Sequence, residues 1–115
     1  MRYIYTIVLL FSLLNANHIL WLGNYDKALK IAYKENKPLM VLLVKKDCQK
    51  CKDVIAKEFT NNAKVDELNK KYISVIITYN SKVSYPIELY YSTTFPTLFF
   101  VDSKTETFLK EPIYY

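Results

Sequence analysis

The chain has 115 residues, a length that suits one small domain and excludes a multidomain architecture. Hydrophobic residues make up 51% of the chain, which excludes wholesale disorder because a packed core can form. The formal net charge of +5 comes from scattered lysines, which favours solvated helix faces over the concentrated basic stripe that binds nucleic acid.

The N-terminal segment has the pattern of a secretory signal peptide. Arg2 supplies a positive end, and residues 3–14 are almost wholly apolar. Ala16 is a small residue that suits cleavage, so we expect a signal peptide at 1–16 and a mature domain at 17–115. About 12 apolar residues are short for a membrane span of roughly 20, but an uncleaved anchor and a core helix stay open as alternatives.

Helical and strand patterns alternate through the middle of the chain. Asn24 is a suitable N-cap for a helix whose apolar positions recur at helical spacing, and Lys37-Pro38 ends that helix. The six apolar residues of Leu39–Val44 predict a strand buried on both faces, as in the centre of a parallel sheet. Two cysteines follow this strand and begin a second helical pattern.

The rest of the chain continues the alternation and predicts an α/β sandwich. The expected features, in chain order, are a helical stretch capped by Asn62, a strand at Ile73–Thr78, a short helix at Ile87–Tyr91, a strand at Leu98–Val101, a turn at 102–106 and a closing strand at Thr107–Leu109. Parallel strands joined by helices and followed by a hairpin give a sheet with helices on its faces.

Cys48 and Cys51 are the only cysteines, and three kinds of site fit this CxxC pair. A zinc site needs four ligands, whereas the chain adds only one histidine, His18, to the two sulfurs. Two thiolates can hold Cu(I), so a copper carrier stays open. A structural disulfide is a further alternative, although closing so short a loop stabilises a fold little.

Redox catalysis is the third kind of site, beside a metal site and a structural disulfide, and it explains the pair most fully. Cys48 is expected at the N-cap or first turn of the helix with its sulfur exposed, where helix-end amides and nearby lysines favour the thiolate. Cys51 lies one helical turn further on and can resolve a mixed disulfide formed by Cys48. Downstream, a trans bond before Pro96 is the common case. A cis bond would instead place an unpaired main-chain edge opposite Cys48, with which an extended substrate can pair.

These segments together make the chain resemble the thioredoxin-like family. The resemblance runs from Tyr25 to Leu109, and it is closest to exported, single-domain members. The chain is also similar to the thioredoxin-like domain of the bacterial transmembrane disulfide reductase. The matching segments are Lys37-Pro38-Leu39-Met40-Val41, Cys48-Gln49-Lys50-Cys51-Lys52, Phe59, the helix from Val65 to Tyr72, and Phe95-Pro96-Thr97-Leu98-Phe99-Phe100-Val101-Asp102.

The resemblance implies a thioredoxin-like three-layer sandwich, in which helices flank a mixed sheet. It implies that Cys48 is the attacking cysteine, that Cys51 is the resolving cysteine and that Pro96 is a cis proline. Phe95, Pro96 and Thr97 are then the expected substrate-binding residues. We expect no cofactor and no metal.

Three positions near the cysteines depart from the family pattern. Asp47 stands where an aromatic residue usually precedes the first cysteine, and Gln49-Lys50 replaces the Gly-Pro of thioredoxin. Leu42 stands where thioredoxin has a buried acid that accepts the proton of the resolving thiol. The sequence offers no obvious substitute base, and a water molecule or Asp53 stays open as an alternative.

The final helix that covers one face of the sheet in the family is missing before Tyr115. Either Tyr114 and Tyr115 patch the gap, a partner covers it, or the sequence is incomplete. An uncovered face would expose apolar surface and favour association.

The sequence therefore predicts an exported thiol-disulfide oxidoreductase that acts on protein disulfides in the periplasm, as a reductase or an isomerase. A reductase in an oxidising compartment needs a supply of electrons, so a membrane electron donor is an expected partner and nucleic acid is not. Membrane contact is expected only if the N-terminal segment stays uncleaved. The alternative from another class is a non-catalytic thioredoxin-like binding module, or a Cu(I) carrier, that uses the same cysteines.

Overall fold

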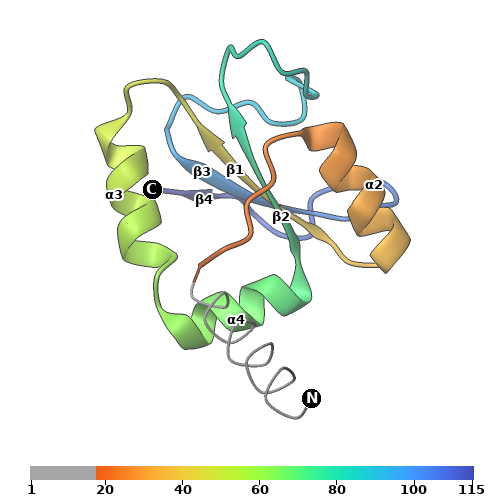
Figure 1. Cartoon of the computed structure of the whole chain (residues 1–115). Helices are drawn as coiled ribbons and strands as arrows, with labels where there is room; N and C mark the ends of the chain where they lie inside the picture. The colour runs from red at the N-terminus through yellow and green to blue at the C-terminus, as the bar shows by residue number, and fades with distance from the viewer. Residues whose placement is uncertain (1–17) are drawn as a thin grey trace, which may run out of the picture.

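The structure is a computed structural model that describes residues 18–115, so the predicted signal peptide at 1–16 lies outside the described residues. Figure 1 shows the helices and the sheet of this part of the chain. Their bounds are α2 (Tyr25–Glu35), β1 (Leu39–Val44), α3 (Gln49–Glu58), α4 (Asn62–Lys71), β2 (Ile73–Thr78), β3 (Thr97–Val101) and β4 (Ile113–Tyr114). Within residues 18–115, no helix is both long and apolar enough to span a bilayer.

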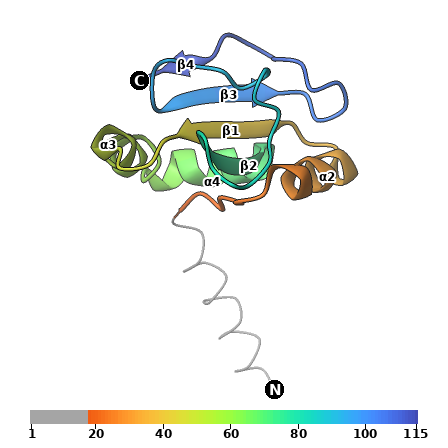
Figure 2. The ribbon, with the colours of Figure 1, turned by 90° about the horizontal axis from the view of Figure 1, so that it is seen from above.

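The strands form one mixed sheet in the order β2-β1-β3-β4, and Figure 2 shows them side by side in that order. β1 runs parallel to β2, from Leu39 opposite Ile73 to Val44 opposite Thr78. β3 runs antiparallel to β1, and β4 runs antiparallel to β3. The predicted mixed sheet is confirmed.

β1 is the centre of the core, because all six of its residues are buried. Leu39, Val41 and Leu43 pack in a cluster with residues of α2. Met40 and Leu42 pack in a second cluster with residues of α3 and α4. Successive side chains of a strand point to opposite faces, so the two clusters lie on opposite sides of the sheet. Figure 1 shows α2 and α3 on these two sides, which confirms the three-layer sandwich.

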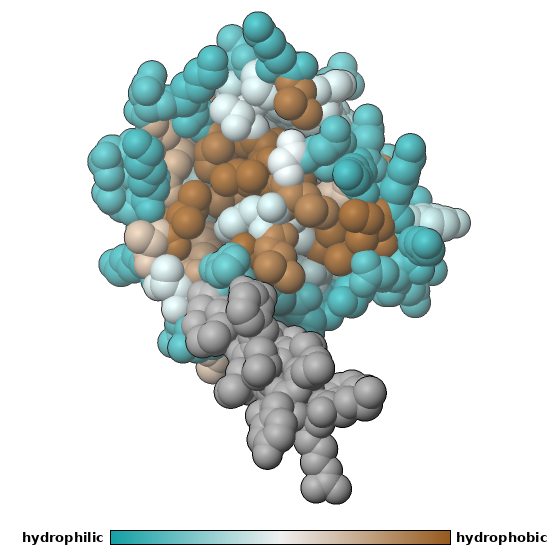
Figure 3. Space-filling model, viewed as in Figure 1, coloured by the Kyte–Doolittle hydropathy of each residue, from teal (hydrophilic) through white to brown (hydrophobic). Residues whose placement is uncertain are grey.

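Hydrophilic side chains cover the outer surfaces of the helices. Figure 3 shows them over α3 and α2, with apolar residues gathered over the sheet between the two helices. Lys27 and Lys30 of α2 and Lys52 and Lys57 of α3 are exposed. The scattered lysines therefore lie on solvated helix faces, as the sequence predicts.

α2 begins as predicted and ends slightly early. The side chain of Asn24 accepts a hydrogen bond from the N–H of Lys27 at 3.0 Å. The helix ends at Glu35, before the predicted stop at Lys37-Pro38. The reason is that Asn36 adopts a left-handed conformation, with φ 57°, which terminates the helix.

α4 begins one residue earlier than predicted. Its N-cap is Asn61, whose side chain accepts a hydrogen bond from the N–H of Lys64 at 3.2 Å. Asn62, the predicted cap, is the first residue of the helix. Two adjacent asparagines offer the same capping group, and the sequence alone does not distinguish them.

Ile87–Tyr91 forms a turn, so the predicted short helix is wrong. The main-chain N–H groups of Leu89 and Tyr90 both donate to the carbonyl oxygen of Pro86, at 3.2 Å. Tyr90 is buried, and its hydroxyl lies 2.8 Å from the hydroxyl of Tyr25 in α2. This contact with a distant element holds the segment in its turn.

The closing strand lies further along the chain than predicted. In the predicted strand Thr107–Leu109, only Phe108 forms a bridge, an isolated one opposite Val101. Lys110–Pro112 then separates this bridge from β4, which completes the pairing with β3. Proline has no N–H to donate, so the pairing cannot run unbroken through this segment.

Lysine side chains and Tyr115 lie over part of the sheet face that carries Phe100. Phe100 and Tyr72 are both buried. The Lys110 ammonium lies 4.0 Å from the centroid of the Phe100 ring, and the Lys71 ammonium lies 5.6 Å from that of Tyr72. Tyr115 packs against the same cluster. Tyr115 therefore fits the alternative in which a C-terminal tyrosine patches the gap, whereas Tyr114 is 57% exposed and a hollow lined by Met40, Leu98 and Phe100 lies on this face.

Candidate functional site

Cys48 and Cys51 form a disulfide bond at the start of α3, with their Cα atoms 5.2 Å apart. Cys48 is the N-cap residue, with φ −104° and ψ 96°, as predicted. Its extended backbone turns the sulfur over the first helical turn, where it accepts a hydrogen bond from the N–H of Cys51 at 3.0 Å. Because a helix N-terminus favours negative charge, this geometry stabilises a Cys48 thiolate once the pair is reduced.

Both cysteines are largely buried. As whole residues, Cys48 is 7% exposed and Cys51 is 4% exposed, and the exposure predicted for the Cys48 sulfur stays a prediction. Both belong to the buried cluster against which Phe95 and Tyr115 pack. Aromatic residues from two distant segments thus pack against the cluster that contains the cysteines, which the local sequence does not reveal. Cys48 keeps the larger exposed fraction of the two.

The Phe95–Pro96 peptide bond is cis, as the family resemblance implies. Because Leu43 of β1 lies opposite Thr97 of β3, this bond sits at the end of β1 from which the chain continues to Cys48. Among residues 18–115, no main-chain hydrogen bond engages the N–H or C=O of Phe95. An unpaired main-chain edge therefore lies at the same end of the sheet as the disulfide.

The ring of Phe95 is held between two other elements. The Lys45 ammonium lies 5.4 Å from its centroid, and the ring of Tyr79 lies 5.4 Å away at an angle of 54°. Lys45 follows β1 and Tyr79 follows β2, and both side chains are exposed. A cation and an aromatic ring thus flank the edge at Phe95.

Lys50 and Tyr115 join the cysteine turn to Pro96. The Lys50 ammonium donates to the main-chain carbonyl oxygen of Tyr115 at 2.6 Å. The N–H of Tyr115 donates to the carbonyl oxygen of Pro96 at 3.3 Å. Burial and then the charge of Glu58 raise the pKa of the Tyr115 phenol. Sequence reasoning missed this link, because Lys50 and Tyr115 are 65 residues apart.

Thr97 is fully buried, and its hydroxyl bonds to groups of the preceding segment. It donates to the carbonyl oxygen of Thr94 at 2.6 Å and lies 2.9 Å from the hydroxyl of Ser92. Its main chain pairs on both sides, with Leu43 and with Tyr114. Phe95 therefore carries the unpaired main-chain groups, whereas Thr97 is buried and its main chain is paired on both sides.

The positions that depart from the family pattern supply no buried carboxylate beside Cys51. Leu42 is fully buried in the core. Asp53, one of the two alternatives left open, lies on the exposed side of α3 and accepts a hydrogen bond from the Gln49 amide at 3.0 Å. Asp47 is exposed and has a left-handed backbone with φ 53°, which turns the chain into the N-cap.

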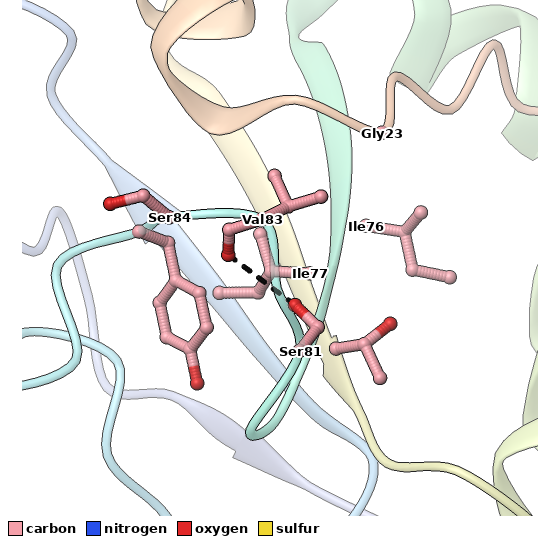
Figure 4. A pocket seen from close by; sticks show the side chains of 8 residues that line it. Gly23, Ile76, Ile77, Ser81, Val83 and Ser84 are labelled. Carbon is pink, nitrogen blue, oxygen red and sulfur yellow. Dashed lines mark hydrogen bonds between the residues drawn. The ribbon is translucent and has the colours of Figure 1, made fainter.

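A separate hollow of about 90 Å³ lies beside β2, and Figure 4 shows its lining residues. In it, the Ser81 hydroxyl donates to the carbonyl oxygen of Val83 at 3.3 Å. Neither cysteine nor Pro96 lines it, so it is distinct from the disulfide site. In the part of the chain that the structure describes, no three His, Cys, Asp or Glu side chains gather as metal ligands.

Comparison with known proteins agrees with this geometry. A family model described as thioredoxin-like matches residues 20–103. Among curated proteins, anterior gradient protein 3 of Mus musculus is 42% identical over 50 residues, which are 44% of this chain and 30% of that protein. The match therefore spans less than a third of that relative.

Two solved structures share the fold. A solution structure of a candidate disulphide-isomerase from Bacteroides thetaiotaomicron superposes with a TM-score of 0.66 at 25% identity, covering 79% of this chain and 77% of that one. The structure of DsbH oxidoreductase superposes with a TM-score of 0.64 at 18% identity, covering 86% of this chain and 74% of that one.

Proposed function

This chain belongs to the thioredoxin-like family, and we propose that it is a thiol-disulfide oxidoreductase that acts on protein disulfides through Cys48 and Cys51. One observation carries the proposal. Cys48 caps α3, is bonded to Cys51 one turn further on, and lies at the same end of the sheet as the unpaired main chain of Phe95. The description of a structural neighbour as a candidate disulphide-isomerase supports the same chemistry.

The reaction starts from the reduced pair. The Cys48 thiolate attacks one sulfur of a substrate disulfide, forms a bond to it, and displaces the other substrate sulfur as a thiolate. The Cys51 thiolate then attacks the Cys48 sulfur, forms the Cys48–Cys51 bond and releases the second substrate thiolate. The substrate gains two electrons, and the protein ends with the disulfide seen at the start of α3.

The surroundings of Cys51 favour isomerisation within this scheme. Leu42 offers no carboxylate to accept the Cys51 proton, and Asp53 lies on the exposed side of the helix. The resolving step is therefore expected to be slower than the first attack. A longer-lived mixed disulfide gives a second thiol of the substrate time to attack, which rearranges the substrate disulfide without net transfer of electrons.

The segment Phe95-Pro96-Thr97 is the proposed substrate-binding site. The free N–H and C=O of Phe95 can pair with an extended segment of the substrate, as in strand addition. Lys45 and Tyr79, which contact the Phe95 ring, lie beside that segment. Thr97 supports the edge from within the fold.

The proposed place of action is the periplasm. Residues 1–16 are proposed as the export signal and residues 17–115 as the mature domain. In an oxidising compartment the pair stays reduced only if a dithiol donor returns electrons to it, so a membrane electron donor is the proposed partner.

Insulin reduction with dithiothreitol as the electron source tests the activity. Cys48→Ser and Cys51→Ser are each expected to abolish turnover, because each removes one of the two thiols that the scheme uses. Ser84→Ala, at an exposed residue of the separate hollow, is the control and keeps the parent rate. A parent protein that reduces no insulin but binds Cu(I) tightly would overturn the proposal in favour of a copper carrier.

A further inference from the structure

Ser92 and Thr97 flank the segment that carries Pro96, and their hydroxyls meet inside the fold. Thr97 is 0% exposed and Ser92 is 9% exposed, and their hydroxyl oxygens lie 2.9 Å apart. Both hydroxyls also reach the carbonyl oxygen of Thr94, at 2.6 Å from Thr97 and 3.0 Å from Ser92. Side chains therefore close the bend at residues 93–96.

The polar groups of this cluster satisfy one another. Each hydroxyl has one proton to donate and can also accept hydrogen bonds. Thr97 donates to Thr94, which is the shortest contact, and Ser92 donates to Thr97 or to Thr94. The Ser92 oxygen in turn accepts the N–H of Thr94 at 3.1 Å. Removing the Thr97 hydroxyl takes from the Thr94 carbonyl oxygen its shortest hydrogen bond, and removing the Ser92 hydroxyl leaves the N–H of Thr94 without its acceptor.

The hydroxyl pair acts from the sheet face opposite the cysteines. Side chains alternate along β3, so Thr97 shares a face with Phe99, which packs in the cluster with α2. Leu98, between them, packs in the cluster that contains both cysteines. The hydroxyls make no hydrogen bond to either sulfur among the described residues. Their connection to the chemistry is the main chain of Phe95 and Pro96.

From this placement we propose that Ser92 and Thr97 are positioning residues that set the affinity of the site for polypeptide disulfides. They fix the bend that presents the Phe95 edge, so less ordering is required when an extended substrate pairs with it. A small disulfide does not use this edge, and its reaction depends on the cysteines alone. The inference rests on the proposed function and adds that polypeptide binding and sulfur reactivity are separable.

Thr97→Val tests the inference, because it removes the hydroxyl and keeps a branched side chain. The assay compares insulin, a polypeptide disulfide, with 2-hydroxyethyl disulfide, a small neutral one, in reaction with the reduced protein. Thr97→Val is expected to raise KM for insulin and to lower kcat/KM by about tenfold, whereas the rate constant with the small disulfide changes by less than about twofold. Thr97→Ser keeps the hydroxyl and is expected to retain parent kinetics with both substrates.

Two further variants complete the design. Thr105→Val removes one hydroxyl of an exposed pair, 2.7 Å from Thr107, and is expected to change neither reaction. Ser92→Ala removes the other hydroxyl of the buried pair and replaces Thr97→Val if circular dichroism shows that variant to be unfolded. Equal losses with both disulfides, unchanged insulin kinetics, or Thr97→Ser behaving like Thr97→Val would overturn the inference. A parent protein that reacts with neither disulfide would overturn the proposed function itself.

Discussion

Cys48 and Cys51 differ in their surroundings although only three residues separate them. Cys48 has an extended backbone outside the helix, and its sulfur accepts the Cys51 N–H at 3.0 Å. Cys51 lies within the first helical turn and is the more buried of the two. The helix end therefore acts on the Cys48 sulfur, which is the attacking atom in the proposed reaction.

This difference predicts selective alkylation of the reduced protein. Cys48 is expected to react with iodoacetamide at least about tenfold faster than Cys51, because the thiolate is the reactive form. Peptide mapping by mass spectrometry after a short pulse gives the ratio. The protein unfolded in urea is the control and should label both cysteines alike. Equal labelling of the folded protein would contradict the stabilisation of Cys48 by the helix end.

Tyr25 and Tyr90 bring two phenols into the core beside α2. The Tyr25 hydroxyl donates to a carboxylate oxygen of Glu106 at 2.8 Å. The Tyr90 hydroxyl lies 2.8 Å from the Tyr25 hydroxyl. Burial raises the pKa of the Tyr25 phenol, and the hydrogen bond with Tyr90 raises it further. Burial also raises the pKa of the Tyr90 phenol. The pair links α2 to the segment that leads to Pro96.

The raised pKa values predict lower stability at alkaline pH. The unfolded chain loses these phenol protons near pH 10.0 while the folded chain keeps them, so the unfolded state binds fewer protons above that pH. The stabilisation that each raised pKa gives to the folded state is fully present below pH 10.0. Above pH 10.0 the free energy of unfolding falls by up to about 1.4 kcal/mol per pH unit for each phenol.

Urea titrations from about pH 8 to 11 measure this slope. Tyr90→Phe is expected to make the slope shallower than in the parent protein, since one raised pKa is removed. Tyr91→Phe is the matched control, because Tyr91 is 66% exposed, and it should keep the parent slope. Identical slopes in the parent protein and Tyr90→Phe would contradict the assignment to the buried pair.

The capping of α2 shows how far local chemistry determines an element. Asn24 begins the helix in the structure as the sequence predicts, because its side chain accepts a nearby N–H and needs no distant partner. β1 has the predicted bounds for a similar reason, since six consecutive apolar residues suit a strand that is buried on both faces.

Asn24→Ala is expected to lower the free energy of unfolding by about 1 kcal/mol, because the N–H of Lys27 loses its side-chain acceptor. Asn24→Ser keeps a capping oxygen and should lose only a small part of that value. Urea denaturation followed by circular dichroism measures both variants. A parent-like stability of Asn24→Ala would show that the cap does not stabilise α2.

Contacts between distant segments account for the elements that the sequence did not predict. Ile87–Tyr91 is a turn because Tyr90 packs beneath α2, against Tyr25. β4 takes the closing position because Pro112 follows the isolated bridge at Phe108 and pairing resumes only beyond it. The contact of Tyr90 has no signal in the spacing of nearby residues, and Pro112 marks the interruption but not the strand with which Ile113–Tyr114 pairs.

The candidate site as a whole combines three separate parts of the chain. The cysteines and the Phe95-Pro96-Thr97 segment were predicted, because motif order and the family resemblance identify them, and the structure brings them to one end of the sheet. The burial of Cys48 in a cluster with residues of several elements and the link from Lys50 to Tyr115 were not predicted, because both depend on contacts between segments far apart in the sequence.

Trapping with Cys51→Ala tests the proposed chemistry most directly. The variant keeps Cys48 as the attacking thiol and lacks the thiol that resolves the mixed disulfide, so adducts should accumulate. Cys48→Ala is the matched control with the other cysteine alone. Mixing each reduced variant with insulin, followed by non-reducing electrophoresis and mass spectrometry, should show dithiothreitol-sensitive adducts through Cys48 only. Absence of adducts with Cys51→Ala, or equal adducts with both variants, would contradict the assignment of Cys48 as the attacking cysteine.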